Sequence, residues 1–387
     1  MNKSQIENIA PKIGDSFFVY EKESLINAYN NLRSSLGNNG EVAFSIKSNY
    51  FSEVINDLKN QNSWFEVSSE SEYEYVNSLG VEMNKVVVNA PVSTPQFFIK
   101  CLNNSSIFNI QNVRQWRDCK GIAAIAPNKE IQIGLRLNLG YNSRFGLSEE
   151  SYNQILIELG ELKNVAICSL HVHVCEGERS VKSFEEKFNK LIKLSENKSL
   201  ANLQTLNIGG GFYSPMPDYL KDQFKDYIPD LEEYLSLLKK LSSKSEYKLI
   251  IEPGGLLVSN SMKFYTKVLS VDLLKMNSFI QVDGSIYDIQ PTKSPKQLPY
   301  NVLSNSSAKI EAKVVGFTCM EDDVLIESFS EPCEEGDWIE FTNVGAYAQT
   351  LRPAFISSWK PIISIDENDF TLHRPKADNL NLFSQWL

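Results

Sequence analysis

The chain has 387 residues, a formal net charge of −10 and a sequence pI near 5.1. Apolar residues make up 42% and charged residues 22%, proportions typical of a folded soluble protein with one large domain or two smaller ones. An acidic surface disfavours nonspecific nucleic-acid binding, and no apolar stretch reaches the length of a membrane-spanning helix. The polar N-terminus lacks the apolar segment of a signal peptide, so we expect a cytoplasmic protein that contacts neither nucleic acid nor membrane.

The cysteines show neither the pattern of a disulfide framework nor that of a metal site. They lie at positions 101, 119, 168, 175, 319 and 333, with no Cys-x-x-Cys pair. Scattered cysteines of this kind are typical of reduced thiols in the cytosol. We therefore expect neither disulfides nor a bound metal ion.

The first strand-like run is Phe17–Tyr20, which we expect to pair with a second domain as part of an N-terminal segment, residues 1–35. The next run, Glu41–Ile46, ends directly before Lys47, and a helix is expected to begin near Ser52. In a parallel α/β barrel, the C-terminal ends of the strands carry the active site. Lys47 is therefore a candidate catalytic residue, although a lysine at a strand end is ordinarily only a solvated side chain.

Strand-like runs alternate with amphipathic helices up to about residue 258. The candidate strands are Lys85–Asn89, Ile131–Leu137, Ala166–Val172, Thr205–Ile208 and Leu249–Glu252. Apolar residues at helical spacing lie between them, as at Phe184–Ile192 and Leu231–Leu241. This alternation predicts a parallel sheet, and we expect it to close into a (β/α)8 barrel over residues 36–258.

The pattern changes after about residue 259. Strand-like runs then follow one another without long helices, at Lys263–Val271, Ser278–Val282, Lys309–Val315, Val324–Glu327 and Trp338–Thr342. Turn residues such as Glu335-Gly336-Asp337 separate them. Residues 259–387 are therefore expected to form a C-terminal antiparallel β domain.

Residues suited to one kind of chemistry recur in order along the chain. They are Lys47, His171 with His173, Gly209–Gly211, Glu252 with Gly254, Cys319 with Asp323, and Tyr347. A lysine amine, a stacking ring, an amide-rich turn and a carboxylate are what a pyridoxal phosphate site needs. Taken one at a time, each has an ordinary structural explanation, such as a buried histidine, a tight turn or a small core cysteine. Their common order favours the cofactor site.

This order of motifs resembles the fold-type III pyridoxal-phosphate decarboxylases, the ornithine and diaminopimelate decarboxylase family. The resemblance extends from about Phe17 to Tyr347, and its specificity lies in the order and spacing of individually weak motifs. It implies an alanine-racemase-like barrel, a C-terminal β domain, pyridoxal 5'-phosphate as cofactor and a small amino-acid substrate. It also implies a head-to-tail homodimer whose two active sites lie at the interface between the subunits.

The resemblance assigns the cofactor-binding positions. Lys47 carries the cofactor covalently, His173 stacks on its ring, and Glu252 pairs with its pyridinium nitrogen, which a carboxylate keeps protonated. The other expected positions are Arg136 and the Ser143–Gly146 loop after it, Gly209, Gly210 and Gly211 beside the phosphate, Gly254 after Glu252, Tyr347 at the phosphate, and the segment Phe65–Glu72 with Glu72 at its acidic position. Glycine lets backbone N–H groups close on a phosphate dianion without obstruction.

The resemblance assigns the substrate side of the site to the β domain. Cys319 and Asp323 match residues that the neighbouring subunit lends to the site, and Met320 and Tyr347 are expected to contact the substrate there. The Cys319 thiol is expected to return a proton to the carbanion that decarboxylation leaves. Cys319, Lys47 and His173 are therefore the candidate catalytic residues.

Four positions depart from the family pattern. Cys175-Glu176 follows His173 where Gly-Ser is usual, and both Gly255 and Gln290 stand where the family has arginine. Met320 replaces an acidic residue that meets the distal amine of the substrate. A buried distal charge is costly without a partner. We therefore expect decarboxylation of an unusual amino acid or an amino-acid conjugate, as in a siderophore-type pathway.

Three alternatives stay open. The chain could be a diaminopimelate decarboxylase of lysine biosynthesis, a pyridoxal-phosphate-dependent amino-acid racemase, or a catalytically degenerate paralogue that only binds the cofactor. Alanine racemases of this fold usually place an arginine at the pyridine nitrogen. Glu252 therefore favours decarboxylation, for which a protonated ring nitrogen is the better electron sink.

Overall fold

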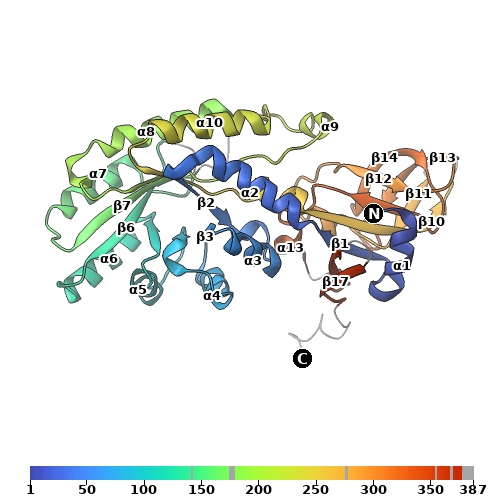
Figure 1. The fold of residues 1–387 in the computed structure, drawn as a ribbon, viewed down its shortest axis with the longest axis horizontal. Coiled ribbons are helices and arrows are strands. Elements are labelled where there is room, and N and C mark those ends of the chain that lie inside the picture. The colour runs from blue at the N-terminus through green and yellow to red at the C-terminus, as the bar shows by residue number, and fades with distance from the viewer. Residues whose placement is uncertain (141–142, 174–178, 275–277, 354, 367–368, 377–387) are drawn as a thin grey trace. The chain divides into compact units, whose positions relative to one another are not determined.

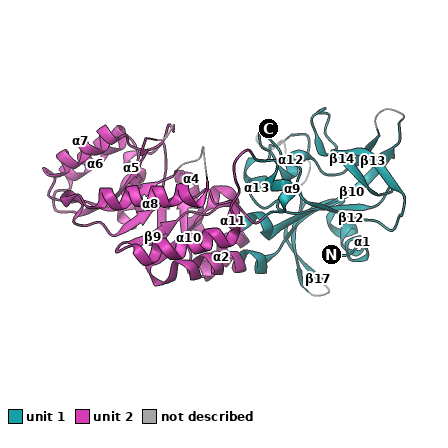
Figure 2. Cartoon of the chain, turned by 90° about the horizontal axis from the view of Figure 1, so that it is seen from above, with its two compact units in different colours: residues 1–25, 216–224, 258–387 teal, residues 26–215, 225–257 magenta. Residues whose placement is uncertain are grey.

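The computed structural model describes residues 1–387 with the exception of 141–142, 174–178, 275–277, 354, 367–368 and 377–387 (Figure 1). The chain forms two compact units (Figure 2). The barrel unit comprises Ile26–Pro215 and Lys225–Leu257, and the β unit comprises Met1–Leu25, Met216–Phe224 and Val258–Leu387. The departure at Cys175-Glu176 lies outside the described residues.

The domain boundaries expected near residues 36 and 259 differ from these units in two places. Helix α2 (Lys22–Leu36) belongs to the barrel unit from Ile26 onward. Met216–Phe224 belongs to the β unit, because the Gln223 amide bonds both the backbone N–H and the backbone carbonyl of Gln297.

The barrel unit contains a closed barrel of eight parallel strands, which confirms the predicted fold class. In order around the barrel, the strands are β2 (Gly40–Ser45), β3 (Trp64–Val67), β4 (Val86–Val88), β5 (Ile107–Ile110), β6 (Ile131–Leu137), β7 (Val165–Val172), β8 (Thr205–Asn207) and β9 (Lys248–Ile251). Pairing of β9 with β2 closes the ring. Both faces of such strands are covered, which explains why they are rich in apolar residues.

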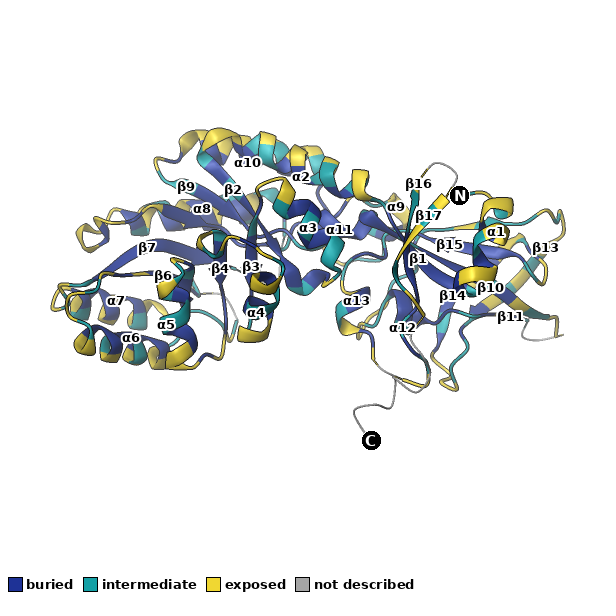
Figure 3. Ribbon diagram, turned by 60° about the horizontal axis from the view of Figure 1, so that its bottom comes forward, coloured by how far each residue is buried: buried dark blue, intermediate teal, exposed yellow. Residues whose placement is uncertain are grey.

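Helices surround the barrel and begin at polar caps. Besides α2 they are α3 (Ser52–Asn60), α4 (Glu70–Ser78), α5 (Pro95–Asn103), α6 (Val113–Ile125), α7 (Glu149–Leu159), α8 (Val181–Ser195), α10 (Leu231–Lys244) and α11 (Gly255–Val258). The side chains of Ser69, Thr94 and Asn112 accept hydrogen bonds from the first turns of α4, α5 and α6. Buried and exposed residues alternate along these helices, as amphipathic packing requires (Figure 3).

The described residues also contain five short turns of 3-10 helix. They are η1 (Gly37–Asn39), η2 (Ile46–Ser48), η3 (Met83–Lys85), η4 (Lys198–Leu200) and η5 (Ser259–Ser261). Among them η2 matters most for function, because it follows β2 directly and contains Lys47.

The β unit contains a nine-stranded, mostly antiparallel sheet, as predicted for the second domain's fold class. Its strands are β1 (Ser16–Tyr20), β10 (Met262–Asp272), β11 (Phe279–Val282), β12 (Tyr300–Leu303), β13 (Lys309–Val315), β14 (Val324–Pro332), β15 (Trp338–Phe341), β16 (Ile362–Asp366) and β17 (Asp369–Arg374). Two pairings are parallel, β1 with β16 and β11 with β13. Strand β1 lies between β10 and β16, inside the sheet.

Helix α1 (Lys3–Ile13) packs its apolar side on this sheet. The shared core consists of Ile6, Ala10, Ile13, Phe17, Val19, Tyr265, Trp338 and Ile363. The unit also has the short helices α9 (Asp218–Lys221), α12 (Ile286–Ile289) and α13 (Ala348–Leu351). Within the described part of the chain, every helix is too short or too polar to cross a lipid bilayer.

Candidate active site

Polar side chains gather at the C-terminal ends of the barrel strands. Parallel strands all end at the same rim, so residues far apart in the sequence meet there. Lys47 follows β2, Glu66 lies near the end of β3, Asn89 follows β4, and Glu252 follows β9. The hydrogen bonds among these residues define a connected site.

Lys47 is surrounded by oxygen atoms from β2 and β3. Its Nζ donates to Ser45 Oγ at 2.7 Å, to Ser68 Oγ at 3.2 Å and to Glu66 Oε2. The Lys47 side chain is 34% exposed, whereas that of Glu66 is 1% exposed. Burial opposes ionisation of Glu66, but the Lys47 ammonium group and nearby donors outweigh it and hold the pKa of Glu66 below its ordinary value.

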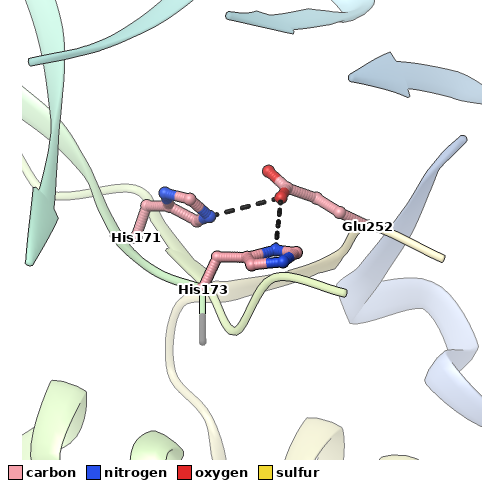
Figure 4. Close-up of side chains that lie close together, drawn as sticks. All are labelled: His171, His173 and Glu252. Atoms are coloured by element: carbon pink, nitrogen blue, oxygen red, sulfur yellow. Dashed lines mark ion pairs between the residues drawn. The ribbon is translucent and has the colours of Figure 1, made fainter. Parts of the chain in front are cut away.

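Glu252 is a buried carboxylate with two differently placed oxygen atoms. Oε1 accepts hydrogen bonds from Asn89 Nδ2 at 2.8 Å and Asn207 Nδ2 at 2.7 Å. Oε2 lies 3.2 Å from His171 Nε2 and 3.7 Å from His173 Nδ1 (Figure 4). Neither approach has the geometry of a hydrogen bond, so Oε2 is a buried acceptor still in need of a donor.

Burial and mutual interaction shift the pKa values of Glu252 and His171 in this cluster. Burial lowers the pKa of His171, which favours the neutral imidazole. Burial alone would raise the pKa of Glu252, but His171 and His173 hold it well below its ordinary value.

The glycine turn after β8 contacts this cluster through its backbone. Gly209 N donates to Asn207 Oδ1 at 2.8 Å, and Gly210 N donates to His173 Nδ1 at 3.1 Å. A Cβ on Gly209 would lie 2.5 Å from the Val172 carbonyl oxygen, and one on Gly210 would lie 2.2 Å from the Glu252 carbonyl oxygen. Side chains are therefore excluded here, and the turn presents bare backbone at the rim.

His173 and Gly210 also fix a tautomer. Because His173 Nδ1 accepts the N–H of Gly210, the neutral ring carries its hydrogen on Nε2. Nδ1 then has no hydrogen to donate to Glu252, which agrees with their 3.7 Å separation. The ring is held by the glycine turn, with 16% of its side chain exposed.

Two further expected residues lie beside the cluster. Arg136 on β6 pairs in register with His171 on β7, and its Nη1 donates to Gln111 Oε1 at 3.3 Å. Gly254 lies against η2, because a Cβ there would be 3.0 Å from the Cβ of Ser48. The turn that contains Gly254 therefore packs directly on the segment that carries Lys47.

Glu72, at the acidic position of the Phe65–Glu72 segment, is held by two hydrogen bonds near the end of β3. Its Oε1 accepts from Tyr50 Oη and its Oε2 from Ser68 N, each at 2.6 Å. The carboxylate thus shapes the loop after β3. Glu66, which was given no role in the sequence motif, is the acidic residue that contacts Lys47.

The expected substrate residues lie in the β unit: Cys319 and Met320 in the loop between β13 and β14, and Tyr347 after β15. Cys319 is an exposed free thiol, Met320 is exposed, and Tyr347 adopts φ +65° at the start of α13. Their approach to Lys47 stays a prediction. The same holds for their expected origin in a partner subunit.

Asp323 is buried and fully hydrogen-bonded within its own unit. Oδ1 accepts from Ser285 Oγ at 2.9 Å and Ile286 N at 2.8 Å. Oδ2 accepts from Thr318 N at 3.1 Å and from Thr318 Oγ1 at 2.7 Å. The carboxylate therefore anchors the loop that carries Cys319, and a direct contact with substrate stays a prediction.

Three residues of the site received no role from sequence motifs: Glu66, Asn89 and Asn207. Each is a buried polar residue in or directly after an apolar strand. Asn207, for example, lies between Leu206 and Ile208. A single polar residue near the C-terminal end of an apolar barrel strand is the sequence feature that could have indicated these site residues.

Comparison with known proteins places these observations in a family. The family model "Pyridoxal-dependent decarboxylase, pyridoxal binding domain" matches residues 22–259. The diaminopimelate decarboxylase of Haemophilus influenzae is 23% identical over 372 residues, covering 91% of this chain and 88% of that protein. Its counterpart from Neisseria meningitidis serogroup B is 22% identical over 385 residues, covering 95% of this chain and 91% of that protein. Among solved structures, the diaminopimelate decarboxylase of Helicobacter pylori complexed with L-lysine has a TM-score of 0.84 at 18% identity, covering 98% of both chains.

Proposed function

Since the chain belongs to the pyridoxal-dependent decarboxylase family, whose pyridoxal-binding domain matches residues 22–259, we propose that it removes an α-carboxylate from diaminopimelate. Decarboxylation of an amino acid with pyridoxal phosphate is the activity of the family. The substrate is the part that we propose. Relatives named diaminopimelate decarboxylase share nearly their whole length with the chain, which supports this choice.

The specialised, siderophore-type pathway expected from the sequence has no support in these comparisons. They favour the alternative, a diaminopimelate decarboxylase. The racemase alternative is disfavoured by Glu252, a carboxylate whose pKa is held low beside the place where the ring nitrogen is expected.

The residues present fit the cofactor. Oε2 of Glu252 is a buried acceptor without a hydrogen bond, and a protonated pyridine nitrogen is the donor that it lacks. The bare backbone at Gly209 and Gly210 suits a phosphate group. A metal ion is a second possible occupant, because ligand atoms of His171, His173 and Glu252 lie within 4.8 Å of one another. We favour the organic cofactor, since the pyridoxal-binding domain model matches residues 22–259, a range that includes Lys47 and the glycine turn.

When bound, pyridoxal phosphate supplies an electron sink for the carbanion left by loss of carbon dioxide. The chain's own residues then have distinct tasks. Lys47 would hold the cofactor through its Nζ, and Glu252 would keep a proton at the ring nitrogen. His173, fixed by Gly210, would support the ring, and Cys319 would return a proton to the product.

A second candidate substrate is an amino-acid conjugate without a distal charge. The observation that favours it is the missing charge at Gly255, Gln290 and Met320. In the structure, Gln290 Oε1 accepts from the backbone N–H of Lys296, so this amide is engaged in holding its own loop. Gly255 begins α11 and supplies no cation.

A comparison of kcat/KM by carbon dioxide release decides between the two substrates. Under the proposal, meso-diaminopimelate reaches roughly 10⁴ M⁻¹s⁻¹ or more and exceeds lysine and ornithine. A yellow, cofactor-loaded protein that prefers an N-acylated or otherwise conjugated diamino acid would contradict the choice of substrate. A loaded protein that releases carbon dioxide from none of them would be the degenerate paralogue.

We also propose that the active form is a homodimer with shared sites and that it acts in the cytoplasm. The exposed position of Cys319 supports the first point, since a thiol that serves a partner's site must be accessible from its own unit. The second rests on the reduced cysteines expected from their scattered positions.

A further inference from the structure

Glu66 is held in place beside Lys47 by donors to both of its carboxylate oxygens. Oε2 accepts from Lys47 Nζ and from Ser45 Oγ. Oε1 accepts from Ser68 Oγ at 3.0 Å and from Asn89 Nδ2 at 3.2 Å. A carboxylate fixed in this way, at the nitrogen that bonds the cofactor, is placed to do more than balance a charge.

Asn89 separates Glu66 from the second buried carboxylate of the site. The same Nδ2 donates to Glu66 Oε1 and, at 2.8 Å, to Glu252 Oε1. A neutral amide between two anions lets both stay ionised while Lys47 is an ammonium group. The carboxylates therefore have separate tasks: Glu252 lies near the two histidines, and Glu66 contacts Lys47.

The electrostatics of the pair change when a proton leaves Lys47. With Lys47 charged, its attraction outweighs burial and keeps the pKa of Glu66 low. Without that charge, burial and the Glu252 anion favour the protonated carboxyl group, and the hydrogen bond from Ser45 opposes them as the smallest of the contributions. Loss of the proton from Lys47 thus makes Glu66 a better acceptor for that proton.

We propose that Glu66 is the proton acceptor of Lys47, taking one proton from its ammonium group as the nitrogen bonds to the cofactor aldehyde and returning it afterwards. The neutral amine forms a nitrogen–carbon bond to the aldehyde carbon. Its two remaining hydrogens leave with the aldehyde oxygen as water, and the proton held by Glu66 returns to the imine nitrogen. Atoms and charge balance, because one positive charge is present on nitrogen before and after.

Other acidic groups of the described site are less suited to this task. Glu72 is engaged by Tyr50 and by the backbone of Ser68. Glu252 accepts from two asparagine amides and lies beside the histidines. The inference is independent of the substrate proposed above, because it concerns only the reaction of Lys47 with the cofactor.

The test is the reaction of the full-length, cofactor-stripped protein with pyridoxal 5'-phosphate, followed by the absorbance of the imine. At pH near 7, Glu66→Gln is expected to slow this step by about 10²-fold, with a deficit that shrinks as pH rises and solvent removes the proton. A passive ion pair predicts the opposite sign, since removing the carboxylate leaves more free amine. A Glu66→Gln rate equal to or above the wild-type rate would overturn the proposal.

Two controls separate chemistry from folding. Pyridoxine 5'-phosphate lacks the aldehyde, so its unchanged binding to Glu66→Gln shows an intact pocket. Glu41→Gln removes a carboxylate from the other end of β2, where Glu41 pairs with Lys248 at 3.0 Å, and should leave the rate unchanged. If Glu66→Gln does not fold, the rate of imine formation is measured in Glu66→Asp instead. A rate below that of the wild type supports the proposal, and an equal or higher rate contradicts it.

Discussion

Asn207 links Glu252 to the glycine turn. Its Nδ2 donates to Glu252 Oε1 at 2.7 Å, and its Oδ1 accepts from Gly209 N at 2.8 Å. One amide therefore fixes the carboxylate expected at one end of the cofactor and the backbone expected at the other. Asn207 is buried, and both its amide nitrogen and its amide oxygen are hydrogen-bonded. A displacement of the glycine turn should therefore also displace the Glu252 carboxylate.

The first prediction concerns the covalent attachment. Borohydride reduction of the loaded protein should fix the cofactor on Lys47, because its Nζ lies at the rim beside the carboxylates. Peptide mapping by mass spectrometry measures this. Lys248→Ala, at the opposite end of the barrel strands, should keep the label, and a label on another lysine would exclude the assignment.

The second prediction is that Glu252→Gln keeps the cofactor but loses turnover. The amide no longer favours a protonated ring nitrogen, so kcat should fall by about 10²- to 10⁴-fold, the range for well-placed electrostatic groups. Steady-state carbon dioxide release checks this, with Glu41→Gln as the control. Near-normal turnover would mean that Glu252 does not serve the ring nitrogen.

The third prediction concerns the glycine turn. Gly210→Ala places a methyl group 2.2 Å from the Glu252 carbonyl oxygen, so the turn must shift. We expect cofactor affinity to fall by about 10-fold or more, equivalent to roughly 1.4 kcal/mol. Titration with pyridoxal 5'-phosphate measures it. Gly121→Ala, where a Cβ meets nothing within 4 Å, should bind the cofactor like the wild type.

The fourth prediction tests the proposed shared sites. Lys47→Ala and Cys319→Ala subunits should each be inactive, and mixing them should restore part of the activity, because one site of the hybrid has both intact residues. Activity after verified subunit exchange is the readout. If hybrids form but stay inactive, each chain builds its own site.

The fifth prediction is a pH dependence of stability from His171. Burial lowers its pKa from the ordinary value of 6.5. As pH falls below about 6.5, the unfolded chain binds a proton that the folded chain does not, so the free energy of unfolding decreases by up to about 1.4 kcal/mol per pH unit. This loss continues until pH passes the lower folded pKa.

Urea unfolding of the cofactor-free protein near pH 7 and pH 5.5 measures this effect. His171→Gln should show a shallower decrease than the wild type, because glutamine does not titrate. An unchanged slope in His171→Gln would show that His171 binds protons equally in the folded and unfolded states, which would contradict the prediction.

The order of elements could be predicted from the sequence because hydrophobic runs and helical spacing mark each one. Strand β7 and the glycine turn after β8 are examples, since buried parallel strands and tight turns have strong local patterns. Site residues inside such motifs, including Lys47 and Glu252, could be proposed for the same reason.

The contacts among the site residues could not be predicted in this way, because they depend on strand register. Ser45 pairs with Glu66 across β2 and β3, and this register brings Glu66 to Lys47. No spacing in the sequence gives it. In the sequence, Asn89 and Asn207 are ordinary residues at strand ends. Only in the closed barrel do both amides donate hydrogen bonds to Glu252.

The internal position of β1 has a consequence for synthesis of the protein. Its two neighbours, β10 and β16, are translated only after the whole barrel, although β1 itself emerges first. A nascent chain that ends at residue 257 has every barrel strand, while Phe17 and Val19 still lack the core that will bury them. Conversely, a recombinant fragment beginning at residue 259 would leave β10 and β16 with open edges in the middle of the sheet, a configuration prone to aggregation. The N-terminal twenty residues therefore have to be retained, or supplied in trans, whenever the C-terminal part is expressed alone.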